Sequence, residues 1–374
     1  ESFYENCENH SLTYTKDEYE KIFNEPLDDV YLIHQIIGSG SIGQVYLVTN
    51  KSTNEKQVMK ILHPNVKQDI QYFRKFMKFL FFFPCMKNNI LSQFPFDIFE
   101  FINQFNDQTN FINESNNLLH FQQEYKNNSL IIIPTLIKCS SSIMIMSYEE
   151  GISLDKSDLN DYHKDKIVNL YHLFIRNNQM IKNFNHGDLH PGNWKIKIDS
   201  NKNHKLIFYD FGYCWKIPDK LFIEVGTLFF DTFEELNNDL LSSKDNLCKL
   251  TFFCILHNFK NEINKDRLEI ECKEKIKIHI HQELTNRDDF DVLDSLKATI
   301  TFCIHEKLLL DPILIQCYII FIQGQKLFEK YGLMTSEQQE ISDYEVYRER
   351  YLNILTFCKT NDIFKEHTTY IETK

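Results

Sequence analysis

The most informative stretch of this sequence is His186-Gly187-Asp188-Leu189-His190-Pro191-Gly192-Asn193, and a strand-like run, Lys205–Tyr209, leads from it to Asp210-Phe211-Gly212. Asp188 and Asn193 stand five residues apart. This is the spacing, in phosphoryl-transfer loops, between the aspartate that orients the attacking hydroxyl and the asparagine that binds Mg²⁺. Asp210 would supply a second oxygen ligand for the metal. His-Gly-Asp alone would indicate no more than a polar turn, but together these residues favour phosphoryl transfer.

A glycine-rich loop lies between two predicted strands, Tyr31–Ile37 and Gln44–Thr49. Dinucleotide-binding folds share its GxGxxG pattern but continue into a helix, whereas a strand follows here. We therefore predict a hairpin that covers the phosphates of a nucleotide. We expect glycine because a side chain would keep the backbone N–H groups from the phosphates and would disfavour positive φ. The nucleotide-binding residues predicted here are Gly38, Ser39, Gly40, Ser41, Ile42, Gly43 and Val45.

Lys60 is the predicted contact of the α- and β-phosphates, because it lies inside a strand predicted over Gln57–Leu62. A surface lysine on an edge strand is the alternative, which its apolar neighbours on both sides disfavour. Leaving half of a buried ion pair without its partner costs roughly 3–5 kcal/mol, so Lys60 needs a carboxylate. Glu114, in a helix predicted over Phe111–Tyr125, is the better candidate, and Glu124 is the other.

The connection from Lys60 to Glu114 is unusually long for a kinase-like chain, at 54 residues. It contains two further predicted helices, Val66–Phe83 and Asp97–Asp107. We expect the aromatic side chains of the first to pack against neighbouring helices, with contact to a membrane or a lipid as the alternative. These side chains are Phe76, Phe79, Phe81, Phe82 and Phe83.

An apolar strand predicted over Ser142–Met146 runs into Ser147-Tyr148-Glu149-Glu150-Gly151. This pattern fits a hinge whose backbone binds adenine, with Tyr148 in the hinge and Met146 at the back of the pocket. A plain strand and turn fit equally well. A long helix is predicted over Leu159–Asn183, and the sequence from Pro218 onward is mostly helical in its periodicity.

Composition excludes some classes of protein. The chain has 374 residues, with 41 lysines and arginines against 53 aspartates and glutamates, for a net charge of −12. Such a balance disfavours nucleic-acid binding, which relies on a basic surface. The ten cysteines form no CxxC pair, so we expect reduced thiols in an intracellular, reducing compartment. The cytoplasm is the first choice, and an organelle the second if an upstream targeting segment is missing. No apolar run reaches the length of a membrane-spanning helix.

The predicted fold class is α+β, with a bilobal, protein-kinase-like arrangement. We expect a helix and linker over residues 1–30, and a small antiparallel β N-lobe over 31–147 that includes a helical insert at 66–110. A mostly α-helical C-lobe with the catalytic loop would occupy 148–335. A helical tail would follow at 336–374, with its one helix over Ile341–Phe357.

With these motifs, residues 25–333 resemble the UbiB/ADCK family of atypical kinases. The stretch Gly40–Tyr46 is similar to that family's nucleotide-loop signature, Val58–Val66 to its lysine strand and Glu114–Leu118 to its helix-glutamate motif. The stretch His186–Asn193 is similar to its catalytic loop.

That resemblance implies ATP and Mg²⁺ as ligands, and ATPase activity or phosphotransfer to a small-molecule, lipid-linked or protein acceptor. By it, Lys60 contacts the phosphates, Glu114 pairs with Lys60, and Asp188 is the catalytic aspartate. Asn193 and Asp210 would hold Mg²⁺. Two alternatives stay open: a phosphotransferase of the aminoglycoside/choline-kinase kind, and a nucleotide-gated, non-catalytic scaffold or lipid-binding chaperone.

The sequence departs from that family at three places. The alanine-rich nucleotide loop is replaced by Gly38-Ser39-Gly40-Ser41, the acidic ExD by Gln108-Thr109-Asn110, and no KxGQ segment precedes Gly38. We expect a more open cleft, in which residues 1–30 do not fill the space between Gly40 and Asp188.

Overall fold

The computed structural model of the chain describes residues 9–91, 97–198, 204–217, 292–306 and 312–331, with isolated positions at 93, 219, 222, 274, 275, 278 and 308. The chain divides into two compact units. The first comprises residues 1–77, 99–158 and 188–214, and the second residues 78–98, 159–187 and 215–374.

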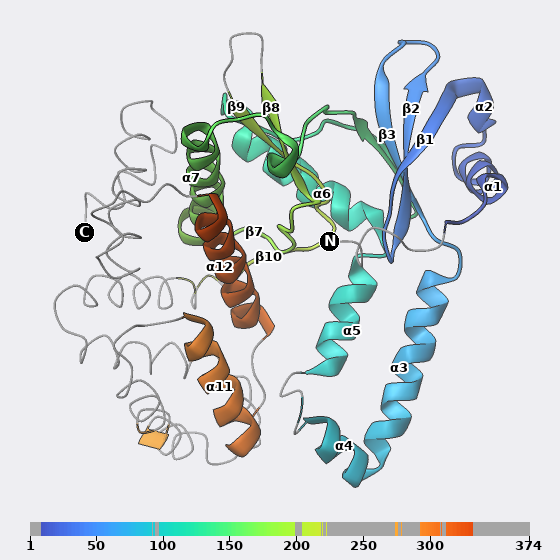
Figure 1. Cartoon of the computed structure of the whole chain (residues 1–374). Helices are drawn as coiled ribbons and strands as arrows, with labels where there is room; N and C mark the ends of the chain where they lie inside the picture. Colours follow the sequence, from blue (N-terminus) through green and yellow to red (C-terminus); the bar gives the residue numbers. More distant parts are fainter. Residues whose placement is uncertain are drawn as a thin grey trace. The chain divides into compact units, whose positions relative to one another are not determined.

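A five-stranded antiparallel sheet forms the frame of the first unit, in the order β1-β2-β3-β6-β5 (Figure 1). Side chains alternate between the two faces of a strand. In β3, Met59 and Ile61 therefore lie on one face and Lys60 on the other. The predicted strands are confirmed, and β5 is an addition that the sequence pattern did not indicate. The strands are β1 (Tyr31–Ser39), β2 (Gly43–Asn50), β3 (Lys56–Leu62), β5 (Leu136–Cys139) and β6 (Ile143–Ser147).

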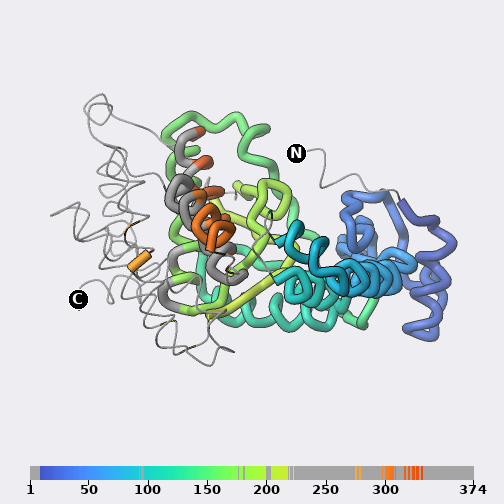
Figure 2. Tube along the Cα trace, turned by 90° about the horizontal axis from the view of Figure 1, so that it is seen from below, coloured from blue at the N-terminus to red at the C-terminus, as the bar shows by residue number. Residues whose placement is uncertain are grey.

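Helix α1 (Leu12–Phe23) covers the face of the sheet that carries Met59 and Ile61, and α2 (Leu27–Val30) leads from it into β1. Both views place α1 beside the first strands (Figure 1 and Figure 2). The hydroxyl of Ser11 caps α1 by accepting from the backbone N–H of Tyr14. Tyr19 is fully buried, so α1 contributes to the hydrophobic core of the sheet. The buried members of this core are Tyr19, Leu27, Tyr31, Tyr46, Val48, Met59, Ile61, Ile143 and Ile145.

Helix α6 (Phe111–Tyr125) lies on the opposite side of the sheet, where Lys60 points (Figure 1). Its bounds are those that the sequence predicts. The side chain of Asn110 caps it by accepting from the N–H of Ile112, and the apolar stripe containing Leu118 is buried.

The insert between β3 and α6 contains three helices: α3 (Val66–Phe82), α4 (Pro84–Leu91) and α5 (Ile98–Asp107). The sequence predicts α3 and α5 but not α4. Pro84 ends α3, yet it also begins α4, because proline at the first helical position needs no N–H donor. Phe76, Phe79 and Phe82 are 55%, 61% and 78% exposed, so the prediction that these aromatic side chains pack on other helices is wrong.

A second, three-stranded sheet in the first unit leads to Asp210. Strand β9 (His204–Phe208) pairs antiparallel with β8 (Trp194–Ile198) and parallel with β4 (Ile131–Ile132). Strand β9 corresponds to the predicted strand-like run, whereas β8 and β4 were not indicated by the sequence pattern.

The described part of the second unit is helical. It contains α7 (Asp161–Asn177), α11 (Val292–Glu306) and α12 (Pro312–Tyr331), and the short strand β7 (Asn185–His186). Helix α7 packs on α12, where a ring nitrogen of His172 lies 3.0 Å from the carbonyl oxygen of Gly324. A Cβ atom at position 324 would lie 2.8 Å from that ring, so the contact requires glycine.

The predicted unbroken helix over Leu159–Asn183 is corrected by the structure. One π-helical turn, Asn178–Lys182, follows α7, and Asn183 then adopts φ of 49°. The side chain of Asn183 accepts from the N–H of Ile217 and donates to its carbonyl oxygen, at 2.9 and 2.6 Å. The chain therefore leaves the helix at Asn183, where the side-chain amide satisfies the backbone N–H and carbonyl groups of Ile217.

The antiparallel sheet and the helices together confirm the predicted α+β class. The predicted helix Ile341–Phe357, the tail 336–374 and most of the region between Pro218 and α11 lie outside the described residues. Within the described residues, no helix has the length and apolar character needed to span a membrane.

Candidate functional site

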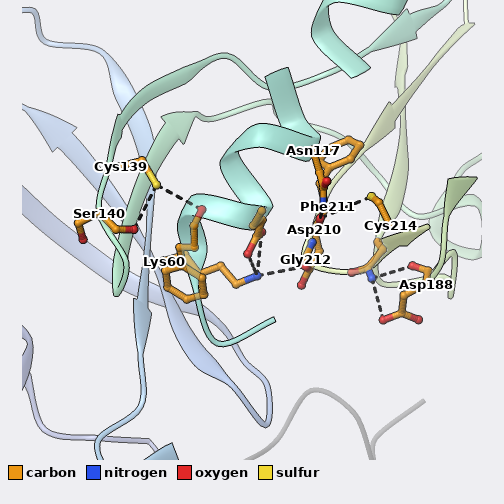
Figure 3. Close-up of polar contacts among 12 residues, drawn as sticks. Lys60, Asn117, Cys139, Ser140, Asp188, Asp210, Phe211, Gly212 and Cys214 are labelled. Atoms are coloured by element: carbon orange, nitrogen blue, oxygen red, sulfur yellow. Dashed lines mark hydrogen bonds and ion pairs between the residues drawn. The ribbon is translucent and has the colours of Figure 1, made fainter. Parts of the chain in front are cut away.

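Lys60 is held by two carboxylates. Its Nζ atom donates to Glu114 Oε1 and Oε2, at 2.9 and 2.8 Å, and to Asp210 Oδ1, at 3.1 Å (Figure 3). The side chain of Glu114 is 1% exposed and that of Asp210 44% exposed. One carboxylate is therefore a buried anchor, and the other faces outward where a ligand can reach it.

Burial and the charge of the ion-pair partner have opposite effects on the pKa values of Lys60 and Glu114. Burial disfavours the ammonium of Lys60, but the carboxylates of Asp210 and Glu114 outweigh it and raise the pKa of Lys60 above its ordinary value. Burial raises the pKa of Glu114 against the opposing effect of Lys60, and the charge of Asp210 raises it further. Lys60 therefore stays a cation at neutral pH, as a phosphate contact requires.

One face of α6 holds the Asp210-Phe211-Gly212 turn. Glu114, Asn117 and Phe121 recur at the spacing of a single helical face. The amide of Asn117 donates to the carbonyl oxygen of Phe211 at 2.9 Å, and the rings of Phe121 and Phe211 lie 5.0 Å apart between centroids. Phe211 is 1% exposed, so its ring anchors the turn under the helix.

The turn itself has an unusual backbone. Asp210 adopts φ of 53°, in the left-handed region that aspartate tolerates better than most residues. Its Oδ1 accepts from the N–H of Gly212 at 3.2 Å. A Cβ atom at Gly212 would lie 3.1 Å from this oxygen and 3.5 Å from Glu114 Oε2, so glycine leaves room for both carboxylates.

Within the predicted catalytic loop, Asn193 and His190 fix the orientation of Asp188. The side-chain amide of Asn193 donates to the backbone oxygen of Asp188 at 2.9 Å and reaches its Oδ2 at 3.4 Å. The Nε2 atom of His190 lies 3.7 Å from the same Oδ2, while its Nδ1 accepts from the N–H of Gly192 at 3.0 Å. In the view of Figure 3, Asp210 lies between Lys60 and Asp188.

The donor set at Asn193 and Asp210 fits Mg²⁺, which prefers oxygen ligands and takes one or two from protein with the rest from phosphates and water. Because the Nδ2 atom of Asn193 donates to Asp188, the Oδ1 atom of the same amide group points away from Asp188. The described residues contain no cluster of three or more His, Cys, Asp or Glu that would bind a metal by itself. A metal shared with a nucleotide is what these side chains could hold.

Lack of space explains only one glycine of the glycine-rich loop, Gly43. None of the described glycines has positive φ, so the expectation of that backbone conformation is wrong. A Cβ atom at Gly43 would lie 2.6 Å from the carbonyl oxygen of Ile61, whereas one at Gly40 would meet nothing within 4 Å. Gly43 thus permits close strand pairing, and Gly40 leaves the loop uncovered. The hydroxyl of Ser39 is buried without a hydrogen-bond partner among the described residues. The other predicted residues of the hairpin are Gly38, Ser41, Ile42 and Val45, and Gly38 pairs with Val45.

The segment predicted as an adenine-binding hinge follows β6. Met146 is buried and pairs with Val58 across the sheet. The backbone N–H of Tyr148 donates to the carbonyl oxygen of Lys56 at 3.3 Å, so it is occupied within the sheet. The hydroxyl of Tyr209 donates to the carbonyl oxygen of Glu149 at 2.7 Å and ties the hinge to β9.

The structure brings several of the predicted site residues into contact. Lys60, Glu114 and Asp210 are in direct contact, and Asp188 contacts Asn193. The carboxylate that binds Lys60 is Glu114 and not Glu124. The roles of Asn117 and Phe121 were not predicted from the sequence. Their spacing of three and seven residues from Glu114 indicates a shared helix face, but it does not identify Phe211 as their partner.

A family model described as "ABC1 atypical kinase-like domain" matches residues 4–241, which is more than half of the chain. The chain belongs to this family. The relatives include proteins named as UbiB and ABC1-family kinases, so the predicted resemblance to the UbiB/ADCK kinases is confirmed, and with it the protein-kinase-like fold.

Three relatives illustrate the sequence identity and the coverage of these matches. "Probable serine/threonine-protein kinase abkC" of Dictyostelium discoideum is 28% identical over 208 residues, which are 54% of this chain and 30% of the relative. "Probable protein kinase UbiB" of Tolumonas auensis is 24% identical over 229 residues, 58% of this chain and 41% of the relative. "ABC1 family protein YPL109C, mitochondrial" of Saccharomyces cerevisiae is 27% identical over 227 residues, 52% of this chain and 34% of the relative. The chain thus spans well under half the length of these curated relatives.

Proposed function

We propose that this chain binds Mg·ATP and acts as an atypical kinase or ATPase. The observation that carries the proposal is the contact of Lys60 with both Glu114 and Asp210. A buried lysine between an anchoring carboxylate and an outward-facing one suits a phosphate site, because the cation is already positioned. Asp210 beside it would bring a metal ion close to the same phosphates.

Each residue has a distinct task in this proposal. Asp188 orients the attacking hydroxyl or water and accepts its proton, while Asn193 and His190 fix the carboxylate. Lys60 contacts the phosphates, and Glu114 keeps its ammonium in place. Asn193 Oδ1 and Asp210 hold Mg²⁺, which would neutralise charge on the phosphates.

The test is ATP hydrolysis by the wild-type chain and by Asp210→Asn. We expect the variant to lose roughly 100-fold or more in rate, since a metal ion contributes several kcal/mol to transition-state stabilisation. Chelation of Mg²⁺ should cause a similar loss. Asp29→Asn, an exposed aspartate of α2 in the same unit, is the matched control and should keep the wild-type rate.

Equal rates for wild type and Asp210→Asn would contradict the catalytic proposal. Stabilisation of the chain by ATP without turnover would instead support the alternative, a nucleotide-gated scaffold. Phosphorylation of a soluble amine or alcohol would support the aminoglycoside/choline-kinase alternative.

We infer that the acceptor lies at a lipid surface, on the evidence of α3. Its exposed aromatic side chains, which include Tyr72, Phe73, Phe76, Phe79 and Phe82, alternate with basic residues. Helix α3 is basic in a chain of net charge −12. It has one acidic residue, Asp69, against four basic residues: Lys67, Arg74, Lys75 and Lys78. Aromatic and basic side chains on one helix are typical of peripheral contact with anionic membranes.

We propose an intracellular, reducing compartment. Among the described residues, Cys85, Cys139, Cys214 and Cys303 form no disulfide bond, as such a compartment would favour. The mitochondrial name of the yeast relative makes an organelle a candidate beside the cytoplasm.

A further inference from the structure

A chain of hydrogen bonds connects the segment before α1 to the glycine-rich loop. The Nε2 atom of His63 lies 3.0 Å from the carbonyl oxygen of Gly40, and its Nδ1 lies 2.8 Å from Nδ1 of His10. The Nε2 of His10 lies 3.0 Å from the hydroxyl of Thr15, which in turn lies 2.8 Å from that of Tyr46. All these residues belong to the first unit.

When both imidazoles are neutral, each bond in this chain can run in one direction only. A carbonyl oxygen accepts, so His63 carries its proton on Nε2 and its Nδ1 accepts when the ring is neutral. His10 must then donate from Nδ1 and accept at Nε2 from Thr15. The hydroxyl of Thr15 accepts in turn from Tyr46. Two neutral imidazoles therefore satisfy the chain in one arrangement only, with the proton of His63 on Nε2 and that of His10 on Nδ1.

The surroundings of His10 favour its neutral ring. Burial, and then the proximity of His63, lower the pKa of His10 to about 4. The backbone N–H of His10 donates to Gln44 Oε1 at 3.0 Å, and the rings of Tyr14 and His10 lie 5.0 Å apart in an edge-on arrangement. Contacts from α1 and β2 thus fix the position of His10.

The bond to Gly40 sets the direction of a peptide group. In a trans peptide the carbonyl and the following N–H point to opposite sides, so holding the oxygen of Gly40 toward His63 turns the N–H of Ser41 away from it. Ile61 lies on the face that α1 covers, and His63, two residues further along, is on that same side with His10. The N–H of Ser41 is therefore directed to the face that carries Lys60.

Gly40 needs such a restraint. Nothing would contact a Cβ atom at this position, so hydrogen bonds rather than packing hold its peptide. The backbone N–H of His63 also donates to the carbonyl oxygen of Ile42 at 2.9 Å. The two ends of the loop tip are thus bound to one residue.

We propose that His63 is a positioning residue for nucleotide binding: it holds the Gly40–Ser41 peptide so that the N–H of Ser41 faces the phosphates, and His10 fixes its ring in the required tautomer. This inference rests on the proposed function as an ATP-binding protein. It gives residues that precede the sheet a direct effect on the shape of the phosphate-binding loop.

The first test needs no nucleotide. Long-range ¹H–¹⁵N NMR spectra of the wild-type chain at neutral pH should show His63 protonated at Nε2 and His10 at Nδ1. A His63 ring protonated at Nδ1 would overturn the proposal whatever the chain binds.

The second test compares Mg·ATP affinities by calorimetry. We expect His63→Leu to weaken binding roughly 5- to 10-fold, as loss of one positioning hydrogen bond predicts, and His63→Gln, which keeps a side-chain N–H donor, to recover most of the loss. Tyr14→Phe is the matched control. It removes the hydroxyl that donates to the carbonyl oxygen of Leu62, next to His63, and should leave affinity within about twofold.

The outcomes separate the two proposals. A wild type that binds Mg·ATP together with an unaffected, folded His63→Leu would overturn the role of His63 alone. An equal loss in Tyr14→Phe would also overturn it, because the effect would then belong to general packing. A wild type that binds no Mg·ATP would overturn the proposed function and this inference with it, while the tautomers would still show whether the hydrogen-bond chain exists.

Discussion

The ammonium of Lys60 faces two carboxylates of unequal exposure, and this asymmetry assigns them different work. Glu114 is buried and accepts two hydrogen bonds from it, so it anchors the lysine in any state of the site. Asp210 is nearly half exposed and accepts one. In the proposed Mg·ATP site, Asp210 would be the metal ligand and Glu114 would keep Lys60 paired.

Replacing Glu114 by glutamine should therefore destabilise the fold as well as the site. Removing one partner of a buried ion pair costs roughly 3–5 kcal/mol, and we expect a value at the lower end because Asp210 still faces Lys60. The free energy of unfolding of Glu114→Gln, from denaturant titration, measures this. Glu124→Gln, an exposed position on the same helix, should change stability by less than about 0.5 kcal/mol. Similar losses in the two variants would contradict the assignment of Glu114.

The sequence indicates some site residues and hides others for a physical reason. A lysine amid apolar residues requires a carboxylate, so Lys60 and Glu114 could be predicted as a pair. Asn117 binds the backbone oxygen of a residue 94 positions away, and any residue offers such an oxygen. Nothing in the sequence around Phe211 therefore marks its partner.

At the scale of elements, regular periodicity was sufficient for β1, β2, β3 and α6. It failed where an element depends on the surrounding fold. Strand β4 has two residues and exists because β9 offers its edge. The π-helical turn after α7 ends where Asn183 binds the backbone of Ile217. Local propensity contains no information about such partners.

Helix α3 carries a prediction of its own. The double substitution Phe76→Ser and Phe79→Ser should reduce co-sedimentation with anionic phospholipid vesicles by at least about tenfold, because burying one phenylalanine contributes about 1.5–3 kcal/mol. It should leave the free energy of unfolding nearly unchanged, since both side chains are more than half exposed.

Tyr162→Ser is a suitable control for that experiment, because this tyrosine of α7 is 55% exposed and lies outside the insert. Its vesicle binding should equal that of the wild type. A double variant that binds vesicles as the wild type does would exclude α3 as the lipid contact. A large loss of stability would show that the two phenylalanines are packed after all.

At the scale of the whole molecule, the candidate site lies within one of the two units. Lys60, Glu114, Asp188, Asn193 and Asp210 all belong to the first unit, together with the glycine-rich loop and the hinge. The second unit contains α7 and α12, which are in contact where His172 lies against Gly324. Nucleotide binding should therefore stabilise the first unit directly.

Hydrogen exchange followed by mass spectrometry can measure this difference. A ligand that binds only the folded site stabilises it by about 2.7 kcal/mol at 100 times its Kd, which slows exchange of amides that open with loss of the ligand. We expect such slowing with Mg·ATP in β2, β3 and α6 and in residues 188–198. Amides of α7 and α12 should exchange at unchanged rates if the second unit opens by itself. Asp210→Asn should abolish most of the slowing. Equal slowing in both units would mean that they open as one cooperative body.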